Sequence, residues 1–297
     1  MIATSRKLSA EPKPRHMVTA PVKRLARSVL GPAQINESDI ARVALRRRRG
    51  VMLDVGAHYG SSLAPFASDG WSIHAFEPDP ANRAKLEAAF GRHPNVIIVP
   101  KGVSDEPGKR PLFTSGESSG ISSLSPFTES HRSTTTVEIT TLRDYMAEAG
   151  IKAVDFMKVD VEGFERNVLK GYDWTIKPDI IVLEFEDSKT LPLGYSWKDL
   201  ADELVTRGYQ VLVSEWFPIE RYGVGHRWRR FGGYPTELVD PNAWGNLIAA
   251  KNLDRVTSAA DRALTRIKFR QRADRLSGVF QRLDSGESSR RSWSKKS

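Results

Sequence analysis

The sequence predicts an α/β fold with a mostly parallel central sheet. Between residues 51 and 250, short apolar runs typical of strands alternate with longer stretches in which apolar residues have helical spacing. The apolar runs are largely continuous, which is the pattern of strands buried on both faces. This region has no internal repeat period, so the alternation indicates one α/β domain rather than a stack of repeats.

Composition divides the 297-residue chain into a central domain and basic extensions. Residues 1–33 are rich in Lys, Arg, Pro and Ser, which is typical of a disordered tail, and residues 34–250 are expected to form the domain. Residues 251–284 place apolar side chains at helical spacing among Arg and Lys, which predicts one or two basic amphipathic helices. Residues 285–297 are expected to be a second disordered tail.

The formal net charge of +9 belongs to the extensions and not to the domain. Lys and Arg outnumber Asp and Glu by 12 to 3 in residues 1–50 and by 13 to 5 in residues 251–297. The 200 residues between them carry 20 basic and 28 acidic residues. An enzyme of nucleic acid concentrates positive charge around its site, so the acidic domain argues against a nucleic-acid partner.

Cysteine is absent, which excludes disulfides, thiolate metal sites and a cysteine nucleophile, and fits a reducing compartment. The sequence has no run of about 18 apolar residues that would cross a membrane, and its basic N-terminus lacks the apolar region of a secretory signal. We therefore expect a cytoplasmic protein. Basic amphipathic helices such as residues 251–284 more often pack on their own domain or on a partner, with peripheral contact to an anionic membrane as the alternative.

The first strand of the domain, residues 51–55, leads into a glycine turn that indicates a ligand site. Asp54 interrupts the apolar strand, Gly56 and Gly60 follow, and a helix is expected over residues 61–68. Glycine allows a sharp turn and close approach of a ligand to the backbone, and a helix start favours an anionic group. The alternative is an ordinary strand–turn–helix connection in which Asp54 caps the helix.

A carboxylate at the end of the second strand, residues 71–76, points to a nucleoside. Glu77 lies about 20 residues past the glycine turn, where a carboxylate accepts hydrogen bonds from ribose hydroxyls. A dinucleotide fingerprint requires G-x-G-x-x-G, but His58 and Ser61 occupy its second and third glycine positions. S-adenosylmethionine has a ribose, an amine and a sulfonium but no phosphate, so the spacing favours this cofactor.

The third turn of the sheet is a second place for the cofactor. Pro78 fits the first turn of a helix expected over residues 79–90, and a third strand is expected over residues 95–100. Val103 and Ser104 follow this strand, at a tip beside the second one. The turn is expected either to hold an adenine ring or to be a plain loop.

Residues 105–135 form a long polar insertion that is dense in Gly, Ser, Thr and Pro. Such loops are often lids. This one is expected either to close over the cofactor and bring His131 or Glu129 toward it, or to be a surface loop without a chemical role. A short strand over residues 137–139 and a helix over residues 141–149 are expected to follow.

The second chemical stretch begins with a buried strand over residues 154–157. Lys158, Asp160 and Glu162 then alternate with valines, so an extended chain places all three charges on one side. Three ionisable groups at the tip of a central strand are costly to bury unless they are paired or used. We expect Lys158 and Asp160 to neutralise each other, Asp160 to orient or deprotonate a hydroxyl, and Glu162 to hold the cofactor amine or the substrate. A structural ion-pair network is the alternative.

The rest of the domain is expected to add a helix, a strand, a helix, a strand, an aromatic-rich segment and a last strand: residues 164–171, 179–186, 196–207, 209–214, 215–244 and 245–250. Glu184 and Glu186 lie on one side of the tip of the strand over residues 179–186. Either one of them is expected to reach the site, or both are solvated. The aromatic and cationic residues of the fifth segment either stack on a sugar or base, or pack on the sheet as a hairpin.

Three stretches together resemble the FkbM family of S-adenosylmethionine-dependent O-methyltransferases: Asp54-Val55-Gly56-Ala57, Phe76-Glu77-Pro78 and Lys158-Val159-Asp160-Val161-Glu162-Gly163. The resemblance covers about residues 51–250. It implies the class I methyltransferase fold, which is a Rossmann-like, seven-stranded, mostly parallel sheet with helices on both faces and an antiparallel last strand. It also implies methylation of hydroxyls on sugars, polyketide rings or related natural products. The family usually has Asn where this chain has His58.

The expected cofactor is S-adenosylmethionine, held by residues of the three turns: Asp54, Gly56, Ala57, His58, Gly60, Glu77, Pro78, Val103 and Ser104. The expected acceptor is a hydroxyl of a sugar, a glycan or glycolipid, or a related natural product. Asp160 is the first choice for the proton acceptor, with Lys158 tuning it, and His131 is the alternative if the loop closes. No metal ligand is predicted. Methyl transfer to nucleic acid or protein, or a non-catalytic binding module of this fold, are the alternative functions.

Overall fold

The structure is a computed structural model that describes residues 35–47, 49–222 and 224–284, with side chains in the last helix up to Phe269. The predicted tails, residues 1–33 and 285–297, lie outside the described residues. The elements in chain order are α1 (Glu37–Leu45), β1 (Val51–Val55), α2 (Ala64–Ser68), β2 (Ser72–Phe76), α3 (Pro80–Phe90), β3 (Val96–Val99), β4 (Gly102–Val103), β5 (Gly108–Thr114), η1 (Ser119–Ile121), β6 (Arg132–Thr140), α4 (Leu142–Glu148), β7 (Phe156–Val159), α5 (Glu165–Lys170), β8 (Ile180–Glu186), α6 (Asp187–Thr190), η2 (Leu191–Leu193), α7 (Trp197–Thr206), β9 (Gln210–Trp216), β10 (Trp228–Gly233), β11 (Trp244–Ala250) and α8 (Leu253–Asp284).

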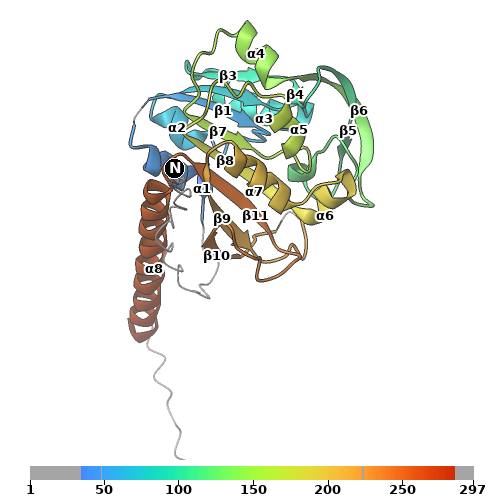
Figure 1. Cartoon of the computed structure of the whole chain (residues 1–297). Helices are drawn as coiled ribbons and strands as arrows, with labels where there is room; N and C mark the ends of the chain where they lie inside the picture. The colour runs from blue at the N-terminus through green and yellow to red at the C-terminus, as the bar shows by residue number, and fades with distance from the viewer. Residues whose placement is uncertain (1–34, 48, 223, 285–297) are drawn as a thin grey trace, which may run out of the picture.

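A central eight-stranded sheet carries the fold, in the order β10-β9-β11-β8-β7-β1-β2-β3 (Figure 1). The strands from β8 to β3 pair in parallel, as predicted. β11 runs antiparallel between β8 and β9, so the expected antiparallel last strand is confirmed. The sheet has one strand more than the seven expected, because part of the aromatic-rich segment forms β10 and pairs with β9 as a hairpin.

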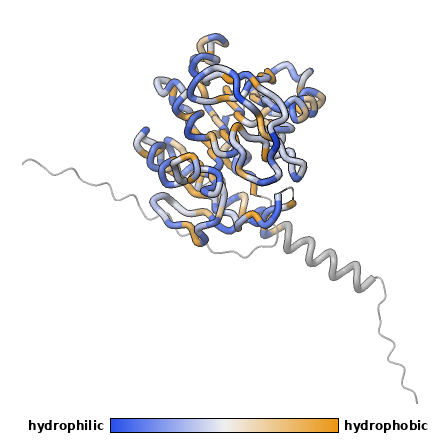
Figure 2. Tube along the Cα trace, turned by 90° about the vertical axis from the view of Figure 1, so that its right-hand side faces the viewer, coloured by the Kyte–Doolittle hydropathy of each residue, from blue (hydrophilic) through white to orange (hydrophobic). Residues whose placement is uncertain are grey.

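Seven of the eight strands of this sheet contribute to two separate cores, and β10 contributes to one of them. Successive side chains of a strand point to opposite faces, so Met52 and Leu53 of β1 lie in different apolar clusters. Met52 belongs to the cluster that contains residues of α1, α2 and the beginning of α8, whereas Leu53 belongs to the one with residues of α4, α5 and α7. The helices therefore cover both faces, with apolar stretches inside and hydrophilic ones along much of the outline (Figure 2).

The basic extension is one helix, α8, whose first part belongs to the domain. Leu253, Val256, Ala260 and Leu264 are buried in the core cluster shared with α1, whereas Phe269 is 69% exposed. Beyond these contacts the helix runs away from the body of the domain (Figure 1). None of the described helices is long and apolar enough to cross a membrane. Contact of α8 with a membrane surface stays a prediction.

A second, three-stranded sheet has the order β4-β6-β5. β5 lies within the predicted polar insertion, β6 begins in it and ends at Thr140, and β4 precedes it. β5 and β6 pair antiparallel, and Leu112, Val137 and Ile139 form a small core of their own. The prediction of a loop over residues 105–135 is therefore wrong at both ends. Consecutive threonines at residues 134–136 are β-branched, which favours the extended backbone despite their polarity.

Candidate active site

Three turns meet at the carboxyl edge of the sheet because β1 lies between β2 and β7. The amides of Gly56 and Ala57 donate to the Phe76 carbonyl oxygen at 3.1 and 3.0 Å, and the Asp160 amide donates to the Val55 carbonyl oxygen at 3.0 Å. These bonds hold the turns after β1, β2 and β7 against one another. The strand tips that carry the sequence motifs are thus brought together.

Gly56 occupies a position where no side chain fits. Its φ is +83°, and a Cβ there would lie 1.8 Å from the Asp160 carbonyl oxygen. Glycine is required both by the left-handed backbone and by this close approach. His58 is also left-handed, with φ of +50°, and its amide points to the Glu77 carboxylate. The turn therefore presents bare backbone.

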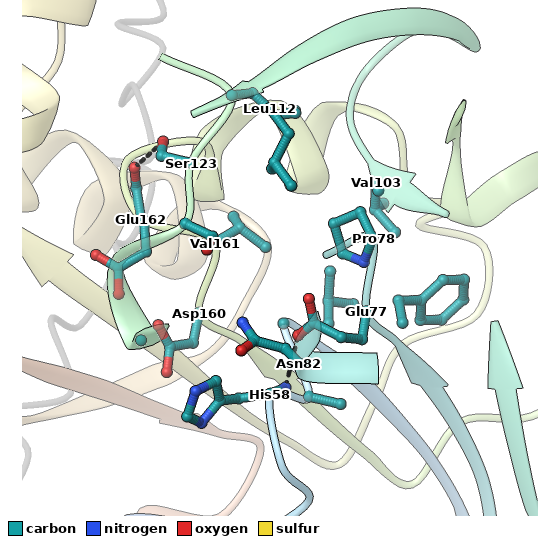
Figure 3. A pocket seen from close by; sticks show the side chains of 18 of the residues that line it. His58, Glu77, Pro78, Asn82, Val103, Leu112, Ser123, Asp160, Val161 and Glu162 are labelled. Carbon is teal, nitrogen blue, oxygen red and sulfur yellow. Dashed lines mark hydrogen bonds between the residues drawn. The ribbon is translucent and has the colours of Figure 1, made fainter. Parts of the chain in front are cut away.

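A cleft opens at these turns and holds most of the predicted site residues. Figure 3 shows Pro78 and Val103 on one side of the cleft and Asp160 and Glu162 on the other. The predicted residues that line it are Gly56, Ala57, His58, Glu77, Pro78, Val103, Lys158, Asp160 and Glu162. Cofactor and catalytic residues of the prediction thus share one cavity.

Glu77 is a buried carboxylate that accepts one backbone hydrogen bond on each oxygen. Oε2 accepts from the His58 amide at 2.8 Å, and Oε1 accepts from the Asp79 amide at 2.9 Å. Burial raises the pKa of Glu77 to about 7, although the two amides act in the opposite direction. Each oxygen keeps a further lone pair, so Glu77 can accept bonds from two neighbouring hydroxyls of a ligand.

Asp54 does not line the cleft but has one oxygen without a partner. Its Oδ2 accepts from the Ser62 hydroxyl at 2.8 Å, whereas Oδ1 is buried and has no hydrogen-bond partner among the described residues. Burial raises the pKa of Asp54, and the Lys158 ammonium opposes this rise. A buried carboxylate oxygen without a partner is costly, so this atom is suited to a ligand amine or to a water beside it.

Two further predicted cofactor residues, Gly60 and Ser104, do not line the cleft either. At Gly60 a Cβ would lie 2.5 Å from the Phe90 ring, so this glycine allows close packing against α3. Ser104 is fully buried, and its hydroxyl donates to the Asp105 carboxylate at 2.8 Å. Residues 101–103, which precede Ser104, form this wall of the cleft instead.

Lys158 and Asp160 neutralise each other, as predicted. Lys158 Nζ donates to Asp160 Oδ2 at 2.9 Å. Burial alone would raise the pKa of Asp160, but the Lys158 ammonium holds that pKa below its usual value. Burial would likewise lower the pKa of Lys158, but the carboxylates of Asp160 and Asp54 raise it. Asp160 is therefore an ionised hydrogen-bond acceptor at the cleft.

The chain does not stay extended as far as Glu162. β7 ends at Val159, and Glu162 has a left-handed φ of +57°. Its carboxylate pairs with the Lys189 ammonium and lies within 4.8 Å of carboxylate oxygens of Asp160 and Glu184. The expected extended backbone is therefore wrong at Glu162, where the turn brings the side chain to a partner from α6, but all three charged residues still line the same cleft.

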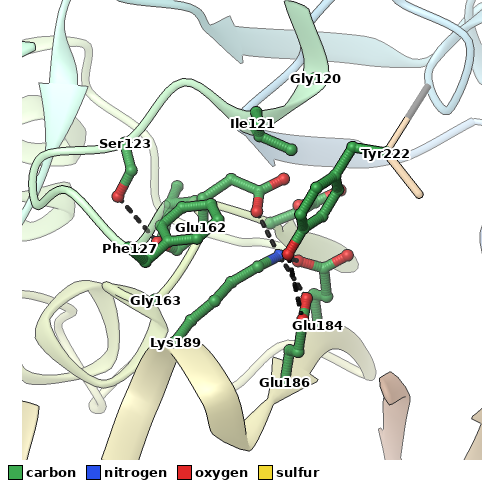
Figure 4. Close-up of polar contacts among 12 residues, drawn as sticks. Gly120, Ile121, Ser123, Phe127, Glu162, Gly163, Glu184, Glu186, Lys189 and Tyr222 are labelled. Atoms are coloured by element: carbon green, nitrogen blue, oxygen red, sulfur yellow. Dashed lines mark hydrogen bonds and ion pairs between the residues drawn. The ribbon is translucent and has the colours of Figure 1, made fainter. Parts of the chain in front are cut away.

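Lys189 is the principal site residue that the sequence did not indicate (Figure 4). It is buried, and its ammonium lies against Glu162, 2.7 Å from Glu186 Oε2 and 3.6 Å from Glu184 Oε2. Burial would lower the pKa of Lys189, but these carboxylates raise it. A lysine in the polar run Asp187–Thr190 looks like a surface residue, so no sequence signal would have found it.

The insertion around η1 borders the cleft, as the lid prediction requires. The residues of this insertion that line the cleft beside η1 are Ser119, Gly120, Ser122, Ser123 and Leu124. The Asn82 side-chain amide donates to the Ser119 carbonyl oxygen at 2.9 Å, and Ser119 Oγ lies 3.1 Å from His58 Nε2. The insertion is thus tied to the cofactor side of the cleft.

His131 does not line the cleft that the insertion borders. Its Nδ1 accepts from the Phe127 amide at 3.2 Å, and its Nε2 donates to the Ile121 carbonyl oxygen at 2.9 Å. Burial lowers the pKa of His131, which favours this neutral form. With both ring nitrogens engaged, His131 holds the insertion in place and has no nitrogen available for a substrate proton. Glu129 is not a lining residue either.

Most of the aromatic-rich segment packs on the sheet, as its hairpin interpretation predicts. Trp216, Trp228 and Phe231 are buried in the core. Tyr222 differs, because its hydroxyl donates to Glu186 Oε1 at 3.1 Å beside Lys189. Tyr222 of this segment therefore reaches the carboxylates that surround Lys189.

The strand order and the meeting of the β1, β2 and β7 tips define a protein of the class I methyltransferase fold. The chain matches the family described as methyltransferase FkbM domain over residues 54–211, and it therefore belongs to that family. The matched residues contain both the glycine turn and the charged tip after β7.

Two relatives carry names that state a methylation. The 31-O-demethyl-FK506 methyltransferase FkbM of Streptomyces tacrolimicus is 31% identical in an alignment of 170 residues that covers 46% of this chain and 65% of the relative. The 2-O-methyltransferase NoeI of Sinorhizobium fredii is 26% identical in an alignment of 156 residues that covers 47% of this chain and 64% of the relative. The chain thus spans slightly less than two thirds of each of these two relatives.

Among solved structures, the chain is similar to the FkbM methyltransferase of Methylobacillus flagellatus. The TM-score is 0.45 and the sequence identity 17%, over 73% of this chain and 48% of the other.

Proposed function

We propose that the protein is an S-adenosylmethionine-dependent O-methyltransferase whose acceptor is a hydroxyl of a sugar, a glycan or glycolipid, or a related natural product. Family membership and the names of the two relatives support hydroxyl methylation. The observation that carries the proposal is a single cleft that joins the glycine turn and Glu77 to Asp160 and Glu162. The acidic composition of the domain favours an uncharged acceptor over nucleic acid.

The tips of β1 and β2 fit this cofactor. Gly56 leaves the backbone bare, and Glu77 keeps lone pairs for the two ribose hydroxyls. Asp54 lies outside the cleft lining, so its unpaired oxygen serves the amine end through a bridging water. Pro78 and Val103 line the cleft with apolar surface suited to an adenine ring. When bound, S-adenosylmethionine supplies a methyl group that its sulfonium has already activated.

The protein's own task is to place the acceptor oxygen and to take up its proton. The ionised Asp160 accepts a hydrogen bond from the acceptor hydroxyl and so orients its oxygen. Lys158 keeps Asp160 ionised and fixes its position. Leu112 and Leu124, from β5 and from the insertion, line the same cleft and exclude water from it.

Two measurements test the proposal. Isothermal titration calorimetry should show that S-adenosylmethionine binds to the full chain. A lack of binding would contradict the proposed cofactor and favour a non-catalytic binding module of this fold. Cell glycans, lipids and small molecules from cells with and without the protein are then compared by mass spectrometry. Species heavier by one methylene group per modified hydroxyl are expected, whereas methylation found only on nucleic acid or protein would contradict the acceptor class.

A further inference from the structure

We propose that Glu162 accepts the proton that the acceptor hydroxyl loses, and that Lys189 is the positioning residue that holds its carboxylate at the cleft. The inference rests on the proposed function, because it assigns one step of hydroxyl methylation to named side chains. It moves the role of proton acceptor from Asp160 to Glu162.

Glu162 is fixed in an unusual conformation at the cleft wall. The Ser123 hydroxyl donates to the Glu162 carbonyl oxygen at 2.8 Å, and the next amide, of Gly163, donates to Glu165 Oε1 at 3.2 Å. A positive φ is uncommon for a residue with a side chain and persists only where its surroundings enforce it. The conformation directs the carboxylate to a defined place beside Asp160.

Lys189 is itself held on several sides. Its side chain is 3% exposed, and Nζ lies 5.1 Å from the Phe127 ring centroid and 5.7 Å from that of Tyr222 (Figure 4). Glu186 pairs with the same ammonium at 2.7 Å and is anchored in turn by the Tyr222 hydroxyl. Because Lys189 has little freedom, the oxygen of Glu162 that it pairs with is immobilised too.

Carboxylates outnumber ammonium groups around Glu162. The charged and titratable groups that face it are Lys189 of α6, Glu184 and Glu186 of β8, Asp160 after β7, Glu165 of α5 and Tyr222. Buried carboxylates this close do not all ionise together. Burial, then the charge of Asp160, raises the pKa of Glu184 well above its usual value, which favours its protonated form.

Glu162 and Asp160 differ as bases. Burial raises the pKa of Glu162 to about 7 even though Lys189 opposes the rise, whereas Lys158 holds the pKa of Asp160 below its usual value. A general base works best when its pKa lies near the working pH, since it is then both available and basic. Glu162 meets this condition, and Asp160 suits orientation of the hydroxyl.

The step balances with Glu162, the acceptor hydroxyl and the cofactor of the proposed function, and it needs no other reactant. The acceptor O–H bond breaks and its proton goes to a carboxylate oxygen of Glu162. The electron pair left on the acceptor oxygen forms the new bond to the methyl carbon, while the sulfur–methyl bond breaks and leaves its pair on sulfur. The positive charge lost from sulfur matches the negative charge lost from Glu162, so the buried site does not gain net charge.

A titration without cofactor tests the assignment by a property other than activity. The full chain carries ¹³C at the glutamate carboxyl carbons, and their NMR shifts are followed against pH. The Glu162 and Glu77 resonances should both titrate near pH 7, and they are assigned by their loss in Glu162→Gln and in Glu77→Gln. Lys189→Met should move the Glu162 midpoint upward by about one to three pH units, because an opposite charge is lost, and leave Glu77 unmoved.

The inference is overturned if the resonance removed by Glu162→Gln titrates near the ordinary value of about 4.3, or if Lys189→Met leaves it unmoved. If Mg²⁺ abolishes the titration, a cation rather than a proton balances these carboxylates, and the inference also fails. If Lys189→Met does not fold, the wild-type and Glu162→Gln titrations still show whether Glu162 titrates near pH 7 or near its ordinary value.

Turnover supplies a second test with the acceptor that mass spectrometry identifies. Glu162→Gln should lower kcat by about 10²–10⁴-fold with unchanged affinity for S-adenosylmethionine. Lys198→Met is the matched control, because Lys198 is an exposed lysine paired with Glu237 at 2.7 Å, and its pH–rate profile should be that of the wild type. Wild-type kcat for Glu162→Gln would overturn the inference, whereas a wild type without cofactor binding would defeat the proposed function instead.

Discussion

The two ends of the cleft are built in different ways. At the cofactor end, Gly56 and Glu77 follow consecutive strands, and backbone amides fix both turns. At the acceptor end, Glu162, Glu184 and Lys189 come from three separate parts of the chain, and the Lys189 ammonium pairs with both carboxylates. The cofactor end is therefore a local backbone structure, whereas the acceptor end is a buried titratable cluster that depends on tertiary contacts.

Asp160→Asn should have the largest effect, and it should be confined to the acceptor end. The amide removes the charged acceptor that orients the hydroxyl, so kcat is expected to fall by about 10²–10⁴-fold. Calorimetry should give the wild-type affinity for S-adenosylmethionine, since Asp160 lies across the cleft from Glu77. The exposed Asp173→Asn serves as control. Wild-type turnover in Asp160→Asn would remove this residue from the mechanism.

Gly56→Ala should break the cofactor end. The added Cβ meets backbone that has no room to move, so the free energy of unfolding is expected to fall by about 1–3 kcal/mol and cofactor binding to be lost. Gly208→Ala is the matched control, because Gly208 has φ of +91° with no atom within 4 Å of the added Cβ. If both variants bind cofactor equally, the close approach at Gly56 has no role in binding.

His131→Ala should weaken the insertion without removing a base. Two hydrogen bonds are lost, which lowers the free energy of unfolding by about 1–3 kcal/mol. KM for the acceptor should rise while kcat at saturation is retained. The lowered pKa of His131 makes its contribution present at neutral pH and lost as the pH falls through the unfolded value of about 6.5, where the unfolded imidazole gains a proton. A kcat loss as large as that of Asp160→Asn would restore His131 as a catalytic candidate.

Removal of residues 270–297 should have the smallest effect on the cofactor end and on the acceptor end of the cleft. The truncation keeps Leu253 to Leu264, which pack in the core, so thermal stability and cofactor affinity should match the full chain. A cut at Lys251, by contrast, would remove core residues. Binding of both chains to vesicles with anionic lipid tests the membrane prediction, and equal binding would exclude residues 270–297 from such contact.

The difference between the two ends also explains what the sequence could predict. Gly56 and Glu77 line the cleft at positions fixed by strand order and turn geometry, so local pattern is sufficient to find them. Lys189 and the left-handed turn at Glu162 depend on contacts between distant elements, and neither leaves a pattern in the residues around it. His131 was misjudged because a histidine in a polar loop resembles a catalytic group until its two hydrogen bonds are seen.

A crystal structure of the full chain with S-adenosylhomocysteine tests the central claim most directly. We expect density in the cleft, with both ribose hydroxyls bonded to the Glu77 carboxylate and the sulfur facing Asp160 and Glu162. Density at another place on the molecule, with Glu77 bonded only to its two backbone amides, would contradict it.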